Sequence, residues 1–184
     1  TSPCPDGSGA AAFVLACRIT GRCMTQLLKK AGIQPEQVGY INAHATSTQI
    51  GDRAEMQAIH SVFGSLSSLP CVSSTKVRGH PLIEARARLG IFWEQRELGG
   101  GDLRNALKEG VLPPTLNLEE TDIDFGFNLI PKKAIKKDVE YALSNSFGFG
   151  GVNVSLLFDQ FIVRVSLLDA TNYSHSSLPK SFHL

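Results

Sequence analysis

Apolar residues recur with helical spacing in the first third of the chain, and this pattern predicts two helices. The stretch Gly9–Ala31 is mostly apolar and has helical periodicity. Gly32 stands just past it, where helices commonly end, and Pro35 prevents any continuation. A second apolar helical face runs through residues 53–63, and residues 48–52 precede it as a cap.

Strand-like segments alternate with these helices, which is typical of an α/β domain. Short buried strands are predicted at residues 38–43 and 71–74. Residues 141–146 and 152–158 are predicted to form an antiparallel pair around the glycine-rich segment 147–151. This glycine-rich segment is no phosphate cradle, because a strand follows it and no Lys-Ser or Lys-Thr ends it.

The remaining segments have weaker patterns. Residues 81–101 should be helical, but charged side chains crowd them and three consecutive glycines, 99–101, break the pattern. Residues 112–115 form an extended link. After Asp159 apolar and polar residues alternate briefly, and residues 170–184 are interpreted as a loose tail.

Composition narrows the class of protein. The chain has 184 residues, 42% of them hydrophobic, which fits one domain or one half of a larger enzyme. A net charge of +1 gives no sign of nucleic acid or a membrane surface as a partner, and no apolar run is long enough for a transmembrane helix. The opening residues 1–6 contain no initiating Met and no basic region, so we expect them to be interior to a longer chain.

The cysteines match no zinc-binding pattern and include no CxxC motif. Arg18 and Ile19 follow Cys17, and these are not the small residues that let a nucleophile turn sharply into a helix. We therefore predict a structural or incidental role for all four cysteines, which are Cys4, Cys17, Cys23 and Cys71.

Two histidines stand at the ends of predicted strands. His44 follows the first buried strand, and His80 follows Lys76 beyond the second. Side chains at strand ends of an α/β sheet point into a crevice, where imidazole and ammonium groups can stabilise negative charge developing on a carbonyl oxygen. A lone histidine at a strand end is more often structural, and Lys76 alone would be a solvated charge. The sequence contains no evident nucleophile for this chemistry.

Four motifs in the same order resemble those of elongating β-ketoacyl-[acyl-carrier-protein] synthases. They are Asn42-Ala43-His44-Ala45-Thr46-Ser47-Thr48 with Gly51-Asp52 and Glu55; Ser73-Ser74-Thr75-Lys76 with Gly79-His80; Pro113-Pro114-Thr115-Leu116-Asn117-Leu118; and Asn145-Ser146-Phe147-Gly148-Phe149-Gly150-Gly151-Val152-Asn153. The resemblance implies a thiolase-like α/β fold, and this chain resembles its C-terminal half, a sheet between helices. It also implies a homodimer in the complete enzyme, acyl carrier protein as partner, and no cofactor beyond the carrier's phosphopantetheine arm.

The resemblance further implies roles for individual residues. His44 and His80 would stabilise the enolate formed when malonyl-carrier protein loses carbon dioxide, with Lys76 beside them and Glu55 as its ion-pair partner. Thr46 and Thr48 would contact the pantetheine arm. Phe147 would supply an oxyanion-hole N–H and a ring that gates the acyl pocket, next to the turn glycines Gly148, Gly150 and Gly151.

Three features depart from the family pattern. The nucleophilic cysteine, which the family has in its N-terminal half, is not in these residues. One residue is missing between Lys76 and His80, and the charged segment 81–108 replaces a helix of small residues. Residues 11–20 resemble an insertion. We therefore expect a β-ketoacyl synthase C-terminal domain over residues 1–159, out of pattern at 11–20 and 81–108, and a non-family tail over 160–184.

Three functional interpretations follow. The first is a portion of a fatty-acid condensing enzyme that is inactive without the missing half. The second is a non-catalytic remnant or interaction module, and the third is a polyketide synthase-type condensing domain, which would usually show flanking domains. The first interpretation implies a mitochondrial or plastid protein in a eukaryote and a cytoplasmic one in a bacterium.

Overall fold

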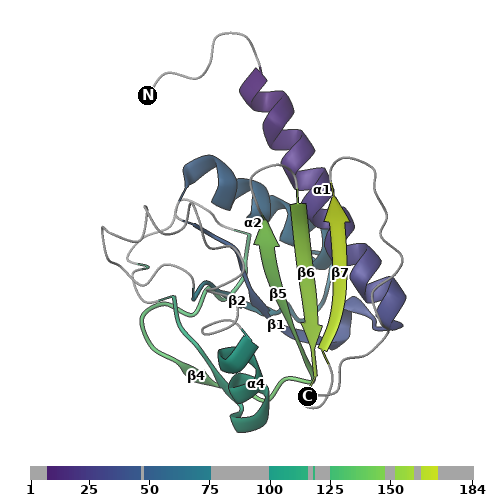
Figure 1. The fold of residues 1–184 in the computed structure, drawn as a ribbon. Coiled ribbons are helices and arrows are strands. Elements are labelled where there is room, and N and C mark those ends of the chain that lie inside the picture. Colours follow the sequence, from purple (N-terminus) through teal and green to yellow (C-terminus); the bar gives the residue numbers. More distant parts are fainter. Residues whose placement is uncertain are drawn as a thin grey trace.

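A single mixed sheet forms the centre of the molecule. The computed structural model describes residues 8–46, 48–75, 100–115, 118, 125–147, 152–159 and 163–169. Five strands form the sheet in the order β2-β1-β5-β6-β7. Their bounds are β1 Val38–Asn42, β2 Cys71–Ser73, β5 Tyr141–Phe147, β6 Val152–Phe158 and β7 Val163–Asp169. Strands β2, β1 and β5 run parallel, whereas β6 and β7 continue the sheet in antiparallel pairing (Figure 1).

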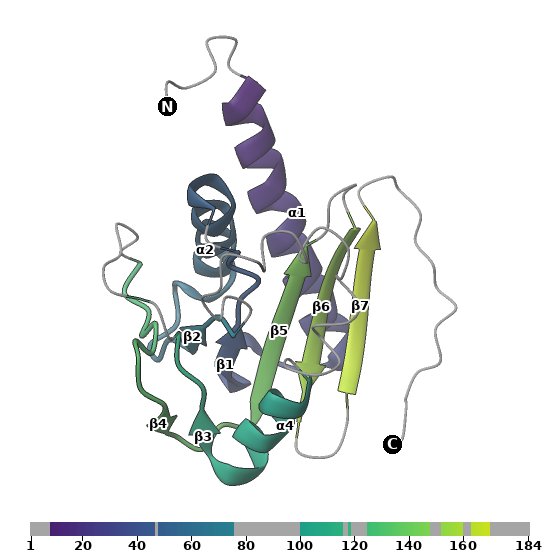
Figure 2. The ribbon, with the colours of Figure 1, turned by 60° about the vertical axis from the view of Figure 1, so that its left-hand side comes forward.

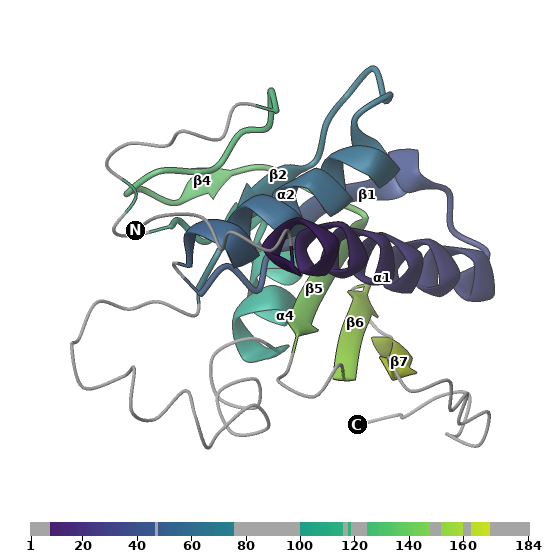
Figure 3. The same ribbon diagram turned by 90° about the horizontal axis from the view of Figure 1, so that it is seen from above.

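Two long helices cover one face of this sheet. Helix α1, Ser8–Ala31, and helix α2, Gln49–Phe63, lie side by side over it (Figure 3). A short 3-10 helix η1, Pro35–Gln37, leads from α1 into β1. Helix α4, Gly100–Glu109, is joined to a small ribbon of strands β3, Val111–Leu112, and β4, Ile135–Lys136, toward the amino end of β5 (Figure 2).

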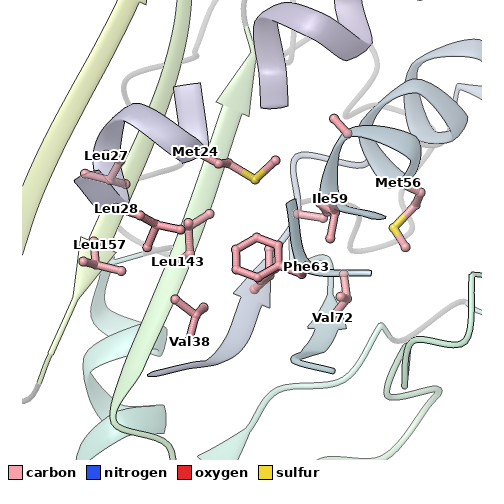
Figure 4. Packing of buried hydrophobic residues seen from close by; sticks show 13 residues of the cluster. Met24, Leu27, Leu28, Val38, Met56, Ile59, Phe63, Val72, Leu143 and Leu157 are labelled. Carbon is pink, nitrogen blue, oxygen red and sulfur yellow. The ribbon is translucent and has the colours of Figure 1, made fainter. Parts of the chain in front are cut away.

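The first hydrophobic cluster lies between the sheet and helices α1 and α2. Phe63 is fully buried at its centre, among side chains from both helices and four strands (Figure 4). Burial of each large side chain contributes roughly 1.5–3 kcal/mol, so this face supplies much of the stability of the domain. The fully buried members with large side chains are Met24, Leu27, Ile41, Ile59, Phe63, Val72, Leu143 and Leu157.

A second cluster covers the opposite face, where helix α4 packs. Neighbouring residues of β5 divide between the two clusters, Ala142 to the second and Leu143 to the first. This is the alternation that a strand buried on both faces requires. The side chains of α4 in this cluster are Leu103, Ala106 and Leu107. The fold is therefore a sheet between helices, as the sequence predicted.

An irregularity at Gly39 changes which face β1 presents. Val38 belongs to the first cluster and Tyr40 to the second, although residues two apart in a regular strand share a face. The register between β1 and β5 shifts between these two residues, which is the signature of a β-bulge. A Cβ atom at Gly39 would lie 2.5 Å from Cγ1 of Val139, so only glycine fits here without rearrangement.

Most of the predicted elements are confirmed. The first helix ends at Ala31, and Gly32 has a φ of +71°. The N–H of Ile33 donates to the carbonyl of Leu28 at 3.1 Å and that of Gly32 to Lys29 at 3.3 Å, which is a Schellman cap. The second helix begins at Gln49, four residues before the predicted face, with Thr48 as its N-cap. Strands β5 and β6 pair as predicted, from Ala142 with Phe158 to Phe147 with Asn153.

Two elements differ from the sequence prediction. Helix α4 begins within the glycine run that was expected to break a helix, because Leu103, Ala106 and Leu107 recur at helical spacing and are buried. Residues 163–169 form β7 and pair along their whole length with β6, whereas the sequence indicated only a brief alternation of apolar and polar residues before the loose tail predicted for 170–184. Residues 81–99 and 170–184 lie outside the described residues. Among the described helices, none is long and apolar enough to cross a membrane.

Candidate active site

The carboxyl ends of three parallel strands meet at one edge of the sheet. Strand β1 is followed there by residues 43–46, β2 by Ser74 and Thr75, and β5 ends at Phe147. The arrows of β1 and β5 point the same way in Figure 2. In open α/β sheets, ligands bind in the crevice outside this edge. The predicted histidine, His44, lies in the segment that follows β1, hereafter the His44 loop (residues 43–46).

His44 and Phe147 contact each other across this edge. Their ring centroids are 5.6 Å apart and the ring planes meet at 73°, an edge-to-face arrangement. Both residues are half-buried, and the Nδ1 atom of His44 is enclosed. Edge-to-face contact between aromatic rings is favourable, so each ring limits the orientation of the other. Two residues that are 103 positions apart in sequence, 44 and 147, thus share one face of the candidate site.

Glu55 holds the backbone of the His44 loop. Its side chain is only 3% exposed, on the face of α2 that meets the sheet. Its Oε1 atom accepts the N–H of His44 at 2.9 Å, and Oε2 accepts the N–H of Ala45, also at 2.9 Å. A buried carboxylate is costly unless hydrogen bonds compensate it, and here both oxygens have backbone donors. Glu55 therefore fixes the position from which the imidazole extends.

A buried polar chain extends from Glu55 into the sheet. The side-chain amide of Asn145 on β5 donates to Glu55 Oε1 at 3.1 Å. The Ser155 hydroxyl on β6 donates to Asn145 Oδ1 at 2.8 Å. Asn145 and Ser155 are each fully buried. Strand β6, strand β5, helix α2 and the His44 loop are thus joined by consecutive hydrogen bonds.

The ends of β1 and β2 are also joined by side chains. The amide of Asn42 donates to Thr75 Oγ1 at 3.1 Å, and Asn42 Oδ1 accepts the Thr75 N–H at 3.4 Å. The Ser74 hydroxyl donates to the carbonyl of Ala45 at 3.2 Å. These contacts fix the start of the segment that runs from β2 into Lys76.

The structure brings together three of the predicted site residues, His44, Glu55 and Phe147. Thr46 and Thr48 are exposed on either side of position 47, between His44 and helix α2. Five predicted residues lie outside the described residues, together with the predicted ion pair between Glu55 and Lys76; they are Lys76, His80, Gly148, Gly150 and Gly151.

Sequence reasoning missed several residues that support the site. Asn145, Ser155 and Asn42 were not singled out individually, although two of them stand within quoted motifs. A signal was present, because asparagine and serine inside otherwise apolar strands need buried partners. Their partners are distant in sequence, up to 90 residues away for Asn145 and Glu55, so the pairing itself was not visible.

The described cysteines have the character of structural residues. Cys23 and Cys71 are buried, and the Cys23 thiol donates to the carbonyl of Asn153 at 3.8 Å. Burial raises the pKa of the half-buried Cys17 thiol above its ordinary value, against a smaller lowering by a backbone hydrogen bond. Within the described ranges, no group of three or more His, Cys, Asp or Glu side chains is arranged to hold a metal ion.

Comparison with known proteins identifies a family for this arrangement. Residues 6–88 match the model described as "Beta-ketoacyl synthase, C-terminal domain". The chain is 38% identical over 162 residues to 3-oxoacyl-[acyl-carrier-protein] synthase 2 of Rhizobium meliloti, covering 88% of this chain and 34% of that protein. It is 43% identical over 162 residues to the mitochondrial 3-oxoacyl-[acyl-carrier-protein] synthase of Arabidopsis thaliana, covering 86% and 31%. The chain thus spans about a third of the length of these relatives.

Solved structures give the same assignment. A β-ketoacyl synthase from Burkholderia phymatum superposes with a TM-score of 0.55 at 32% identity, over 76% of this chain and 32% of that one. A type II polyketide ketosynthase, solved in complex with its acyl-carrier protein, superposes with a TM-score of 0.59 at 27% identity, over 79% and 32%. The fold is therefore thiolase-like, as these ketosynthases are.

Proposed function

Since the chain belongs to the β-ketoacyl synthase family and corresponds to a C-terminal portion of its members, we propose that it forms one wall of a condensing site for fatty-acid synthesis. The single observation that carries this proposal is the position of His44. It lies at the carboxyl edge of the parallel strands, against Phe147, on a loop that Glu55 holds by two backbone hydrogen bonds. Groups fixed in this way can stabilise charge without reorganising during a reaction.

The proposed reaction breaks and forms carbon–carbon bonds in sequence. The bond between C2 and the carboxylate of a malonyl thioester breaks, carbon dioxide leaves, and the electron pair remains as a thioester enolate. The enolate carbon then attacks the carbonyl of an acyl thioester held on a cysteine of the complete enzyme, and the cysteine thiolate is expelled. His44 would donate a hydrogen bond to the enolate oxygen, aided by Lys76 and His80.

The other predicted site residues receive roles by the same proposal. Thr46 and Thr48 are exposed beside His44, so their hydroxyls are available to a pantetheine arm that enters along this edge. The Phe147 N–H would contribute to the oxyanion hole and its ring would gate the acyl pocket. Gly148, Gly150 and Gly151 would give the adjoining turn its freedom, since glycine alone adopts positive φ at low cost.

We further propose acyl carrier protein as the partner and a homodimer as the form of the complete enzyme. No cofactor is needed beyond the carrier's phosphopantetheine arm. We expect none of the four cysteines to be the nucleophile that accepts the acyl group, so these 184 residues by themselves should not condense acyl and malonyl groups. A eukaryotic source would place the protein in mitochondria or plastids, and a bacterial one in the cytoplasm.

Fatty-acid synthesis is favoured over polyketide synthesis by the identities. The fatty-acid relatives from Rhizobium meliloti and Arabidopsis thaliana are 38% and 43% identical to this chain, whereas the polyketide ketosynthase solved with its carrier is 27% identical. A polyketide-type condensing domain therefore stands as the second candidate, supported by the resemblance in fold.

Two measurements on the purified 184-residue chain test the proposal. Binding of malonyl-carrier protein, followed by calorimetry, should be weakened severalfold by the double change Thr46→Ala and Thr48→Ala. The matched control is Thr25→Ala, which removes an exposed threonine from α1, outside the loop. Mass-detected condensation of acyl- and malonyl-carrier protein should give no product. If the double change at Thr46 and Thr48 leaves carrier binding unaffected, the proposed site is refuted. If the 184-residue chain forms condensation product, its dependence on an external cysteine is refuted.

A further inference from the structure

The His44 loop is anchored by hydrogen bonds at several backbone positions. The N–H of Ala43 donates to the carbonyl of Ser73 at 2.8 Å, and those of His44 and Ala45 donate to the two oxygens of Glu55. The carbonyl of Ala45 accepts the Ser74 hydroxyl at 3.2 Å. Both backbone polar groups of Ala45 are therefore held, one by helix α2 and the other by the segment that follows β2.

Ser74 is itself held by Thr115. The N–H of Ser74 donates to Thr115 Oγ1 at 3.1 Å, and that hydroxyl donates to the carbonyl of Leu129 at 3.3 Å. Because the hydroxyl proton points to Leu129, a lone pair of the oxygen is left to face the Ser74 N–H. Thr115 thereby fixes the backbone of Ser74, and Ser74 reaches the His44 loop through its side chain.

Thr115 is in turn fixed on both sides of its backbone. Its N–H donates to the carbonyl of Ile130 at 2.9 Å, and its carbonyl accepts the N–H of Lys132 at 3.1 Å. The proposed condensing role uses none of these contacts, although Thr115 stands in the Pro113-Pro114-Thr115 motif and Ser74 stands two residues before Lys76. A residue that is anchored at every polar group is suited to hold its neighbours still.

We infer that Ser74 and Thr115 are positioning residues, which hold the His44 loop and the segment leading into Lys76 in one fixed relation. This inference rests on the proposed function, because it concerns the position from which His44 would reach a substrate oxygen. Neither residue contacts the substrate in this scheme. Ser74 acts through the carbonyl of Ala45, and Thr115 acts through the N–H of Ser74.

Ser73 provides a matched control. It is the neighbouring residue, is buried like Ser74, and also carries a hydrogen-bonded hydroxyl. That hydroxyl bonds to Tyr40 Oη at 2.7 Å and donates to the carbonyl of Pro113 at 2.7 Å, and neither partner belongs to the His44 loop. The link from Ser73 to the loop is its backbone carbonyl, which Ser73→Ala retains. Loss of a buried hydroxyl is thus common to both changes, and loss of the loop anchor is specific to Ser74→Ala.

The experiment is NMR of the 184-residue chain labelled at histidine and along the backbone. Ser74→Ala should shift the His44 ring signals and speed hydrogen exchange of the Ala45 amide about tenfold, as expected when one anchoring hydrogen bond is lost. Thr115→Val, which removes the hydroxyl, should shift the same signals in the same direction. Thr115→Ser, which keeps a hydroxyl, should give signals like those of the unchanged protein. Ser73→Ala should leave the His44 ring signals and the exchange rate of the Ala45 amide unchanged, even though it lowers the free energy of unfolding.

Two results would overturn the inference. One is unchanged His44 signals in both Ser74→Ala and Thr115→Val, and the other is an equal shift in Ser73→Ala. If Ser74→Ala fails to fold, the comparison of Thr115→Val with Thr115→Ser decides the matter. The readout is the geometry of His44 without any carrier present. If the chain fails to bind carrier protein but the NMR shifts appear as expected, the proposed function is refuted and the role of Ser74 and Thr115 in positioning His44 stands. If carrier binds but the NMR shifts are absent, the positioning role is refuted and the proposed function stands.

Discussion

The side-chain amide of Asn145 donates a 3.1 Å hydrogen bond to Glu55 Oε1, and this contact joins strand β5 to helix α2 beneath the His44 loop. Glu55 uses the same oxygen to accept the N–H of His44. The orientation of the His44 imidazole thus depends on a carboxylate that is itself oriented by the sheet. Hydrogen bonds to a charged group in a buried site are stronger than those between neutral groups, so the network should be sensitive to single changes.

Glu55→Gln should destabilise the domain although it preserves shape. Each carboxylate oxygen accepts at least one backbone N–H, so the new amide must place its NH2 group against a donor. We expect the free energy of unfolding to fall by about 1–3 kcal/mol, measured by urea denaturation. Gln57→Ala, on the exposed side of the same helix, should change it by less than about 0.5 kcal/mol. Equal effects of the two substitutions would contradict this role of Glu55.

Asn145 and Ser155 should be energetically coupled. The Ser155 hydroxyl donates to Asn145 Oδ1 at 2.8 Å, and both residues are fully buried. In a double-mutant cycle of Asn145→Ala and Ser155→Ala, the combined loss should differ from the sum of the single losses by about 0.5–3 kcal/mol. Urea unfolding of the four proteins supplies the numbers. Strict additivity would mean that the hydrogen bond contributes nothing to the network.

Gly39→Ala should destabilise the chain through one identifiable clash. The added Cβ would lie 2.5 Å from Cγ1 and 2.8 Å from Cβ of Val139. We expect a loss of about 1–3 kcal/mol, the usual cost of overpacking. Adding Val139→Ala removes the nearer atom and leaves the Cβ, so thermal unfolding should show partial rescue in the double variant. A fully additive second loss would show that the strain lies elsewhere.

Cys17 should be a poor nucleophile at neutral pH. Burial raises the pKa of its thiol, so less thiolate is present at any given pH than in a small free thiol. Alkylation by iodoacetamide, followed by peptide mass analysis, should therefore be slower at Cys17 than in free cysteine, and its rate should climb at higher pH. Cys23 and Cys71, which are buried, should react only on unfolding. Rapid labelling of Cys17 at pH 7 would make it a candidate nucleophile.

The predictable parts of this fold are those specified by local pattern. Helix α1 and its end at Gly32 follow from periodicity and from glycine's tolerance of positive φ. The pairing of β5 with β6 follows from two strand-like runs around a short glycine-rich segment. Helix α4 escaped prediction because its apolar face is short and begins among glycines. Strand β7 was not predicted, because a short alternation of apolar and polar residues next to a polar segment is weak evidence for a strand.

The sequence indicated several residues of the candidate site, but not the hydrogen bonds that join them. The motif around His44 indicated the loop, and the family resemblance indicated Glu55 and Phe147. The hydrogen bonds that organise the loop join residues distant in sequence, such as Ser74 with Ala45 and Asn145 with Glu55. The local sequence indicates that a buried serine or asparagine needs a hydrogen-bond partner, but it does not identify that partner.

The most direct test of the central claim is to locate the binding of a malonyl thioester on the chain. Malonyl-pantetheine should be titrated into the labelled 184-residue protein and followed by NMR. The account predicts saturable shifts at His44, Thr46, Thr48 and Phe147, with no change in β4, which lies toward the amino end of β5 (Figure 2). Shifts confined to β4, or none at these four residues at saturating ligand, would contradict it.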